Sequence, residues 1–131
     1  MIWGAKNKVG QMLINMRSET ALEKFSAPMR VDCCLIPASG YYEWQGDGTN
    51  KAQYSFSSPQ GVIYMAGCYW AEERSTIAKF VILTRAATEA FKAIHDRMPV
   101  VIRSERIDEW LNRNPDAMGD PILDFACERV K

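Results

Sequence analysis

The apolar positions of this chain fall mainly in short uninterrupted runs and in stretches where apolar and polar residues alternate. Both patterns are typical of β-strands, and few segments repeat at the helical spacing of three to four residues. Tyr54 and Phe56, for example, alternate with polar neighbours and predict a strand. Strands are expected at residues 12–15, 31–38, 41–45, 52–57, 62–70, 79–85 and 100–103, with a charged hairpin around 72–74.

Helical signals are short. Thr20 and Glu23 have the spacing of a capping box, which predicts a helix over residues 21–25 that ends by Pro28. Residues 87–94 also have helical propensity and carry apolar side chains on one side.

A further helix is expected after Ser104, where Ile107, Trp110 and Leu111 have the spacing of a core-facing stripe, and Pro115 should break it. Many strands with two or three short helices indicate the α+β class. Because so small a chain must cover the edges of its apolar strands, we expect a mostly antiparallel sheet that is strongly curved or barrel-like.

The length of 131 residues suits one hydrophobic core, so a single domain over residues 1–131 is expected. The chain has 16 basic and 16 acidic residues and no net charge. Net charge therefore gives no sign of nucleic-acid binding, and any contact with DNA has to come from a local patch.

The four cysteines show no Cys-x-x-Cys spacing and the chain has one histidine, so no structural zinc site is expected. Cys33, Cys34 and Cys68 lie in apolar runs and should be buried and reduced, as in a reducing cytosol. The N-terminus does not resemble a signal peptide, and no stretch reaches the roughly 20 apolar residues that span a bilayer. We expect a cytoplasmic protein with no metal, no other cofactor and no membrane contact.

The one histidine, His95, lies in Ile-His-Asp-Arg-Met-Pro at residues 94–99. Histidine titrates nearest neutral pH, which suits a general acid or base. Arg97 offers a fork of donors that matches a pair of phosphate oxygens. The alternative is a partly buried histidine bonded to a backbone carbonyl.

Glu43 stands in Tyr-Tyr-Glu-Trp at residues 41–44, among three large aromatic side chains. A carboxylate held there is suited to general acid or base work, and the alternative is a solvent-facing glutamate between inward aromatics. Trp44 is suited to stacking on a base, with a core role as its alternative.

Asn15 and Arg17 are two residues apart on an expected strand and should share one face. An amide beside a guanidinium suits an oxyanion, a phosphate or a chain terminus. A surface ion pair between Arg17 and Glu19 is the alternative.

The order of these segments is more specific than any one of them. Asn-x-Arg-x-Glu-Thr, Gly-x-Tyr-Glu-Trp and Ile-His-Asp-Arg-Met-Pro follow one another along the chain. Between them come a Lys-x-x-Tyr strand at 51–54, Ala-Gly-x-x-Trp at 66–70 and a strand that ends in Thr84. In this order the chain resembles the SOS response-associated peptidase family, which crosslinks itself to abasic sites in DNA.

The resemblance implies a covalent chemistry. In the family, removal of the initiator methionine exposes the α-amine of a cysteine, which forms a Schiff base with the ring-opened abasic site in single-stranded DNA. The thiol then closes a thiazolidine ring. Carried onto this chain, the resemblance implies that Asn15 positions the cysteine, that Glu43 assists proton transfer and methionine removal, and that His95 protonates the sugar oxygen.

The same resemblance implies a DNA-binding surface. Arg17 and Arg97 would bind phosphate, and Trp44 and Thr84 would line the groove that holds the DNA.

This chain departs from the family at its start. Ile2 stands where the family has its cysteine, and no cysteine precedes Cys33. The Trp3-Gly4 pair resembles a segment from inside the family's domain, so the first strands and the nucleophile are expected to be missing. A truncated or divergent member, or a misplaced start, would account for this.

We therefore expect abasic-site sensing in single-stranded DNA without a crosslink, and whether the chain is an enzyme stays open. One alternative is a non-covalent module that binds single-stranded DNA. Another is a hydrolase in which Glu43 and His95 activate water, which requires both groups in one cleft. Cys33 or Cys34 could not replace the nucleophile, because an internal cysteine has no free amine.

Overall fold

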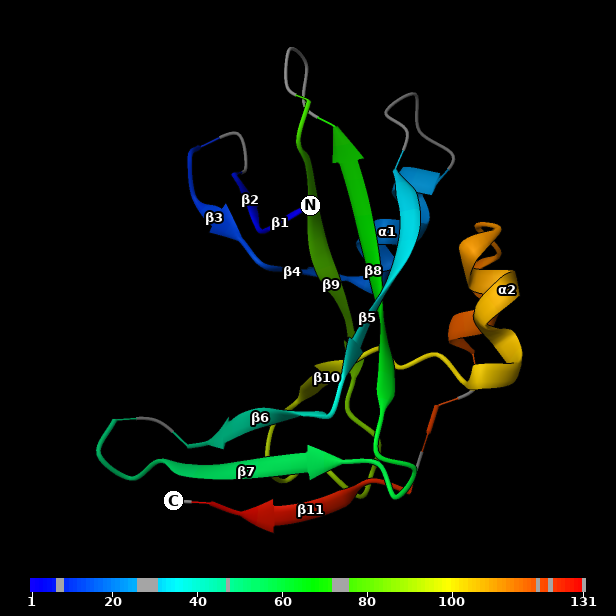
Figure 1. Cartoon of the computed structure of the whole chain (residues 1–131). Helices are drawn as coiled ribbons and strands as arrows, with labels where there is room; N and C mark the ends of the chain where they lie inside the picture. Colours follow the sequence, from blue (N-terminus) through cyan, green and yellow to red (C-terminus); the bar gives the residue numbers. More distant parts are fainter. Residues whose placement is uncertain are drawn as a thin grey trace.

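The described residues of this computed structural model are 1–6, 9–25, 31–46, 48–71, 76–119, 121–122 and 124–130. They form a six-stranded sheet, a three-stranded sheet and a two-stranded hairpin, with short helices beside the larger sheet (Figure 1). The strands are β1 (Ile2–Trp3), β2 (Ala5–Lys6), β3 (Met12–Leu13), β4 (Asn15–Arg17), β5 (Asp32–Ala38), β6 (Gly40–Gln45), β7 (Ala52–Ser57), β8 (Ile63–Ala71), β9 (Ala78–Ala86), β10 (Arg97–Pro99) and β11 (Ala126–Arg129). The helices are α1 (Ser18–Phe25) and α2 (Ile107–Leu111), with short 3₁₀ turns η1 (Ser104–Arg106) and η2 (Pro115–Met118).

The strand β9 organises the larger sheet. It pairs antiparallel with β8 and β10, and parallel with β1 and β4, while β5 pairs antiparallel with the far side of β8. The sheet curls into a half-barrel, which confirms the expected α+β class with a curved, mostly antiparallel sheet.

Successive residues of β9 face two different cores. Val81 and Leu83 pack with Trp110 on the side of the helices, whereas Ile82 packs with Phe56 on the other side. Because both faces of β9 are covered, its sequence is a nearly continuous apolar run.

The three-stranded sheet of β6, β7 and β11 projects from the body, and we call it the arm (Figure 1). Gly40 begins β6 at a point where any side chain would clash with the carbonyl oxygen of Phe56 on β7. Tyr41 then stacks on Phe56 with the ring centroids 4.7 Å apart. This packing joins the arm to the hydrophobic core that contains Phe56 and Ile82.

Of the two elements expected after β9, the helix is wrong and the strand is displaced toward the N-terminus. Residues 87–94 form turns rather than a helix, because the Phe91 ring is drawn into the core and the chain folds back on itself. The N–H of Ala87 donates to the carbonyl of Asp96 at 2.9 Å and closes the loop. The strand expected at 100–103 begins earlier, as β10 at Arg97–Pro99, where it pairs with β9, and within 100–103 only an isolated bridge between Val101 and Met65 follows.

The helices also differ in detail from expectation. Helix α1 begins at Ser18, three residues before the capping-box prediction, and Pro28 lies outside the described residues, as does the hairpin at 72–74. In α2, Trp110 is fully buried but Leu111 is 48% exposed, because so short a helix covers the core with only one turn. Pro115 begins η2, where a missing N–H costs no hydrogen bond.

Cys33, Cys34 and Cys68 are buried free thiols, as expected, while Cys127 is exposed. Burial, together with the charge of Cys33, raises the pKa of Cys34 to about 11. Within the described residues, no group of three or more His, Cys, Asp or Glu side chains is arranged as a metal site. None of the described helices is long and apolar enough to cross a membrane.

Candidate functional site

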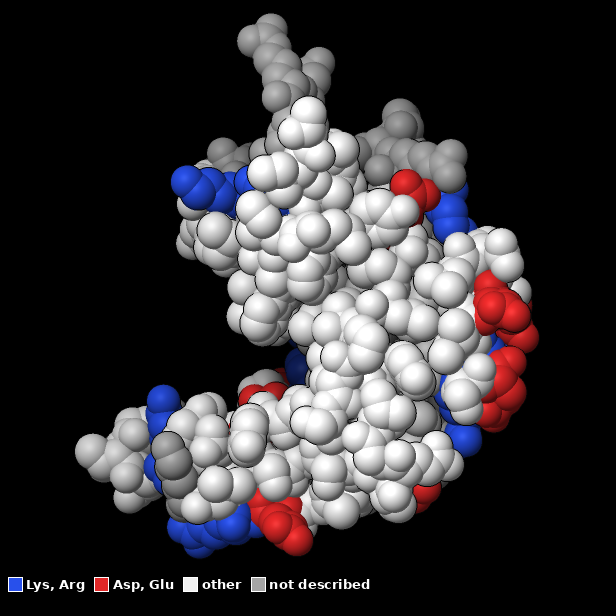
Figure 2. Space-filling view, viewed as in Figure 1, with Lys and Arg blue, Asp and Glu red and all other residues white. Residues whose placement is uncertain are grey.

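A cavity of about 590 Å³ lies between the arm and the edge of the larger sheet. Figure 2 shows this hollow as a notch between the arm and the rest of the molecule. Its walls carry residues from six strands, from the link between β3 and β4 and from the loop before β10: Trp3, Ile14, Asn15, Gly40, Tyr41, Tyr42, Glu43, Met65, Ile82, Thr84, His95, Arg97, Met98 and Pro99. Five of the seven predicted site residues are therefore brought to one place.

The loop before β10 carries His95 to the cavity, and two contacts hold it there. The Phe91 ring lies edge-on to Phe56, with centroids 5.1 Å apart. Gln45 of β6 donates through Nε2 to the carbonyl of Ala93 at 2.8 Å. The loop is therefore tied to the same arm that carries Glu43.

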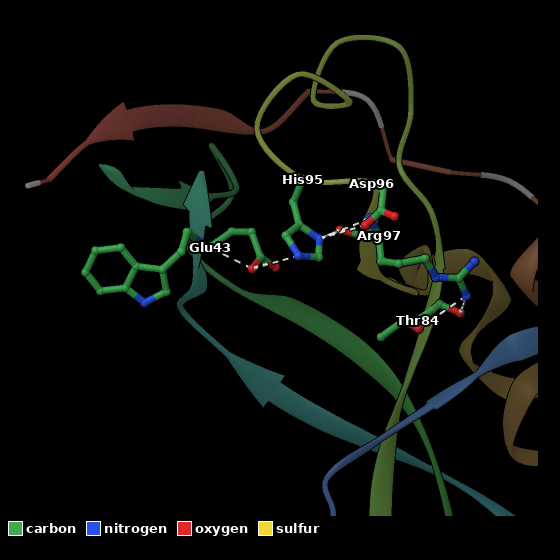
Figure 3. A network of polar contacts seen from close by, with 6 residues as sticks. Glu43, Thr84, His95, Asp96 and Arg97 are labelled. Atoms are coloured by element: carbon green, nitrogen blue, oxygen red, sulfur yellow. Dashed lines mark hydrogen bonds and ion pairs between the residues drawn. The ribbon is translucent and has the colours of Figure 1, made fainter. Parts of the chain in front are cut away.

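Glu43 and His95 point toward each other across the cavity wall (Figure 3). Glu43 Oε1 lies 3.8 Å from His95 Nε2, and the two side chains are 27% and 43% exposed. On the other side of the ring, His95 Nδ1 lies 3.4 Å from the Asp96 carboxylate and accepts a hydrogen bond from the Arg97 N–H at 3.2 Å. The imidazole thus faces a carboxylate at each nitrogen, which suits it to move a proton.

The alternation of β6 explains how Glu43 reaches this position. Tyr42 and Trp44 are 64% and 40% exposed, whereas Tyr41 and Glu43 are half-buried. The alternative of a solvent-facing Glu43 between inward aromatic residues is therefore wrong. Glu43 shares the inward face of β6 with Tyr41, and the aromatic residues on either side of it face outward.

Arg97 lies in the same cavity and is held by β9. Its Nη2 donates to the carbonyl oxygen of Thr84 at 2.9 Å and to the Thr84 hydroxyl at 3.2 Å (Figure 3). Glu19 Oε2 also lies 3.2 Å from Nη2. Glu19 therefore pairs with Arg97 and not with Arg17, as had been considered. The two meet because β4 and β10 both pair with β9 at Thr84, on its opposite edges, and α1 begins directly after β4.

Asn15 and Arg17 share one exposed face of β4, as expected, but only Asn15 lines the cavity. Arg17 is aligned with Thr84 in the parallel pairing of β4 and β9.

Trp44 does not line the cavity, and its ring has Lys51 Nζ at 5.7 Å from the centroid. The cavity is lined by the half-buried Tyr41 and by two exposed aromatic residues, Tyr42 and Trp3, whose Nε1 donates to the Ile14 carbonyl at 2.9 Å. Neither was among the predicted site residues. The sequence could not have predicted their place in the site, because it does not show that β1 and β6 lie on opposite sides of one cavity.

A second cavity, of about 300 Å³, contains none of the predicted site residues. It lies between the turn after β7 and the start of η1, near Ser58 and Arg103. The chemistry expected from the sequence therefore belongs to the first cavity.

The fold and this cavity define a small α+β protein with a curled sheet. Its cavity brings the carboxylate of Glu43 and the imidazole of His95 close to the guanidinium of Arg97, which is hydrogen-bonded to Thr84. A sequence model of the family described as SOS response associated peptidase (SRAP) matches residues 1–127. The chain belongs to this family.

Curated relatives agree with that assignment. The chain is 32% identical over 139 residues to the abasic site processing protein YoaM of Bacillus subtilis, a match that covers 98% of this chain and 61% of that protein. It is 32% identical over 106 residues to the abasic site processing protein YedK of Escherichia coli, covering 77% of this chain and 48% of the relative. The chain thus spans about three-fifths of the length of the first of these relatives.

A solved structure shows the same fold. The crystal structure of a protein from Bacteroides thetaiotaomicron matches with a TM-score of 0.71 at 24% identity, covering 89% of this chain and 58% of that one.

Proposed function

We propose that this chain is a single cytoplasmic domain that binds abasic sites in single-stranded DNA through the cavity between the arm and β9. The names of its relatives as abasic site processing proteins support the substrate class. The cavity supports the mode of binding, because it places a guanidinium suited to phosphate beside aromatic and apolar walls suited to a sugar.

The observation that carries the proposal is the approach of Glu43 to His95 at 3.8 Å on the wall of that cavity. Opening an abasic sugar to its aldehyde requires a proton on the ring oxygen and loss of the hydroxyl proton. A histidine can supply the first, and a neighbouring carboxylate can hold the imidazole in place and accept the second. In this role His95 is the acid, Glu43 is the base and Asn15 binds the sugar or its aldehyde.

We further propose that this stretch of chain binds the abasic site without a covalent bond. Thiazolidine formation needs a thiol and a free α-amine on the same residue. Each of the four cysteines in this sequence has its nitrogen in a peptide bond. Cys33 and Cys34 are also buried in the sheet and do not line the cavity. The family's crosslink and its removal of methionine would require a cysteine that this sequence does not supply.

The test uses three oligonucleotides of one sequence: undamaged, with one abasic site, and with a tetrahydrofuran analogue that cannot open to an aldehyde. We expect native gels to show salt-sensitive binding that is tightest for the abasic oligonucleotide, and denaturing gels to show no shifted band. Arg97→Ala should weaken binding and reduce the slope of log affinity against log salt by about 1, because one phosphate contact is lost.

Lys92→Ala is the matched control, since it removes one exposed positive charge from the same loop but outside the cavity. A band that survives denaturation would contradict non-covalent binding. Equal affinity for all three oligonucleotides would instead support a module that binds single-stranded DNA without sensing the lesion.

The geometry also meets the requirement of the hydrolase alternative, because Glu43 and His95 border one cavity. In that function Glu43 would take a proton from water that attacks a peptide bond. Cleavage of short peptides that is lost in both Glu43→Gln and His95→Gln would favour it over DNA binding.

A further inference from the structure

Glu19 contacts the candidate site, although no role in that site has been assigned to it. It lies in the first turn of α1, and its side chain reaches Arg97 across the end of β9. The Glu19 side chain is 60% exposed, whereas that of Arg97 is 18% exposed. An exposed carboxylate therefore contacts a guanidinium that is largely buried.

Arg97 does not need Glu19 to hold its position. The Nη2 atom carries two protons, and Thr84 alone offers two acceptors to it, the carbonyl oxygen at 2.9 Å and the hydroxyl at 3.2 Å. Glu19 is the third acceptor on the same atom, at 3.2 Å. Removing it leaves both contacts that fix the guanidinium on β9.

What Glu19 contributes is charge. Burial raises the pKa of its carboxyl, but hydrogen bonds from Ser18 and Arg97 and the charge of Arg97 outweigh this and lower it. Glu19 is therefore an anion at neutral pH and neutralises Arg97. A phosphate group that approaches Arg97 meets this negative charge and must displace it.

We propose that Glu19 is an internal competitor that occupies the phosphate position at Arg97 and weakens DNA binding until a phosphate replaces it. This inference rests on the proposed function, in which DNA phosphate binds Arg97. Because Glu19 is on the exposed first turn of α1, its side chain can rotate into solvent without moving the sheet. Competition of this kind lowers the affinity for intact strands, so that contacts to the lesion decide which DNA stays bound.

The first experiment measures fluorescence anisotropy of a labelled single-stranded oligonucleotide over a series of salt concentrations. Glu19→Gln keeps the shape of the side chain and removes its charge. We expect it to tighten binding several-fold and to make the slope of log affinity against log salt steeper by up to about 1. Glu23→Gln changes net charge equally on the same helix and should have a much smaller effect.

A double-mutant comparison separates competition at Arg97 from a general change of the electric field. In the Arg97→Ala background, Glu19→Gln should no longer tighten binding. If it tightens binding equally in both backgrounds, or weakens binding when Arg97 is present, the inference is overturned. The second result would show that Glu19 positions Arg97 instead.

A measurement without DNA distinguishes failure of this inference from failure of the proposed function. Pyrophosphate should raise the melting temperature of Glu19→Gln more than that of the wild type or of Glu23→Gln, and the difference should vanish with Arg97→Ala. If that holds but no variant binds DNA, the proposed function is wrong and the competition stands. Equal shifts in all variants, with DNA binding retained, overturn the competition alone.

Discussion

At the scale of single residues, the side chains of this protein are sorted by the two faces of its strands. Glu43 and Tyr41 face inward on β6 while Tyr42 and Trp44 face outward, and Cys33 and Cys34 point to opposite sides of β5. The chemistry open to each residue follows from the side on which it falls. The cysteines offer the most direct test of this sorting.

We expect iodoacetamide at pH 8 to label Cys127 alone in the folded protein. The reactive form of cysteine is the thiolate, and the raised pKa of Cys34, about 11, keeps that thiol protonated while burial also blocks the reagent. Raising the pH from 8 to 10 should speed labelling of Cys127 but leave Cys34 nearly unlabelled. Peptide mass mapping gives the labelled positions, and a sample in urea, where all four thiols react, is the control. Labelling of Cys34 at the rate of Cys127 would contradict the burial of β5.

At the scale of elements, short helices serve to cover one side of the curled sheet. Helix α2 has five residues, too few to be stable alone, and Trp110 is its one fully buried side chain. Trp110 is fully buried and donates through Nε1 to the carbonyl of Cys34 on β5 at 2.8 Å. Trp110 therefore joins the helix to the sheet both by packing and by a hydrogen bond.

Trp110→Phe should lower the free energy of unfolding by about 2 kcal/mol, because it loses buried volume and leaves a buried carbonyl without this donor. Leu111→Ala, on the exposed side of the same turn, should cost less than about 1 kcal/mol. Urea unfolding followed by circular dichroism measures both. Equal losses would mean that α2 is held by its exposed side as well.

At the scale of the whole molecule, stability is distributed unevenly between the body and the arm. The strands β8 and β9 lie between two cores, and Ala66, Cys68, Val81 and Leu83 on them are fully buried. Among the described strands, β11 lies at the edge of its sheet and pairs with β7, and all four of its residues are exposed. The arm carries Glu43, so one side of the cavity is built on the less buried part of the fold.

Amide hydrogen exchange should therefore be slowest in β8 and β9 and faster by orders of magnitude in β11. Mass spectrometry of peptic fragments measures this, with fully exchanged protein as the reference. Protection of β11 equal to that of β8 would show that body and arm open as one unit.

The strand content, the curved α+β sheet and the buried thiols could be predicted from the sequence, because they depend on local patterns of apolar residues along the chain. Motifs in the order of the family also predicted Asn15, Glu43, Thr84, His95 and Arg97 as site residues, and these five line one cavity. The failures are local signals overruled by packing. Residues 87–94 favour a helix, but burial of Phe91 against Phe56 turns that segment into a loop.

Which of these residues contact one another became clear from the three-dimensional fold. The contact of Glu43 with His95 joins positions 52 residues apart, and that of Glu19 with Arg97 joins positions 78 apart. Such pairs depend on the parallel addition of β4 to β9 and on the bend that carries β5 into the arm. No local pattern encodes either feature, because each arises from the way separate strands share edges and cores.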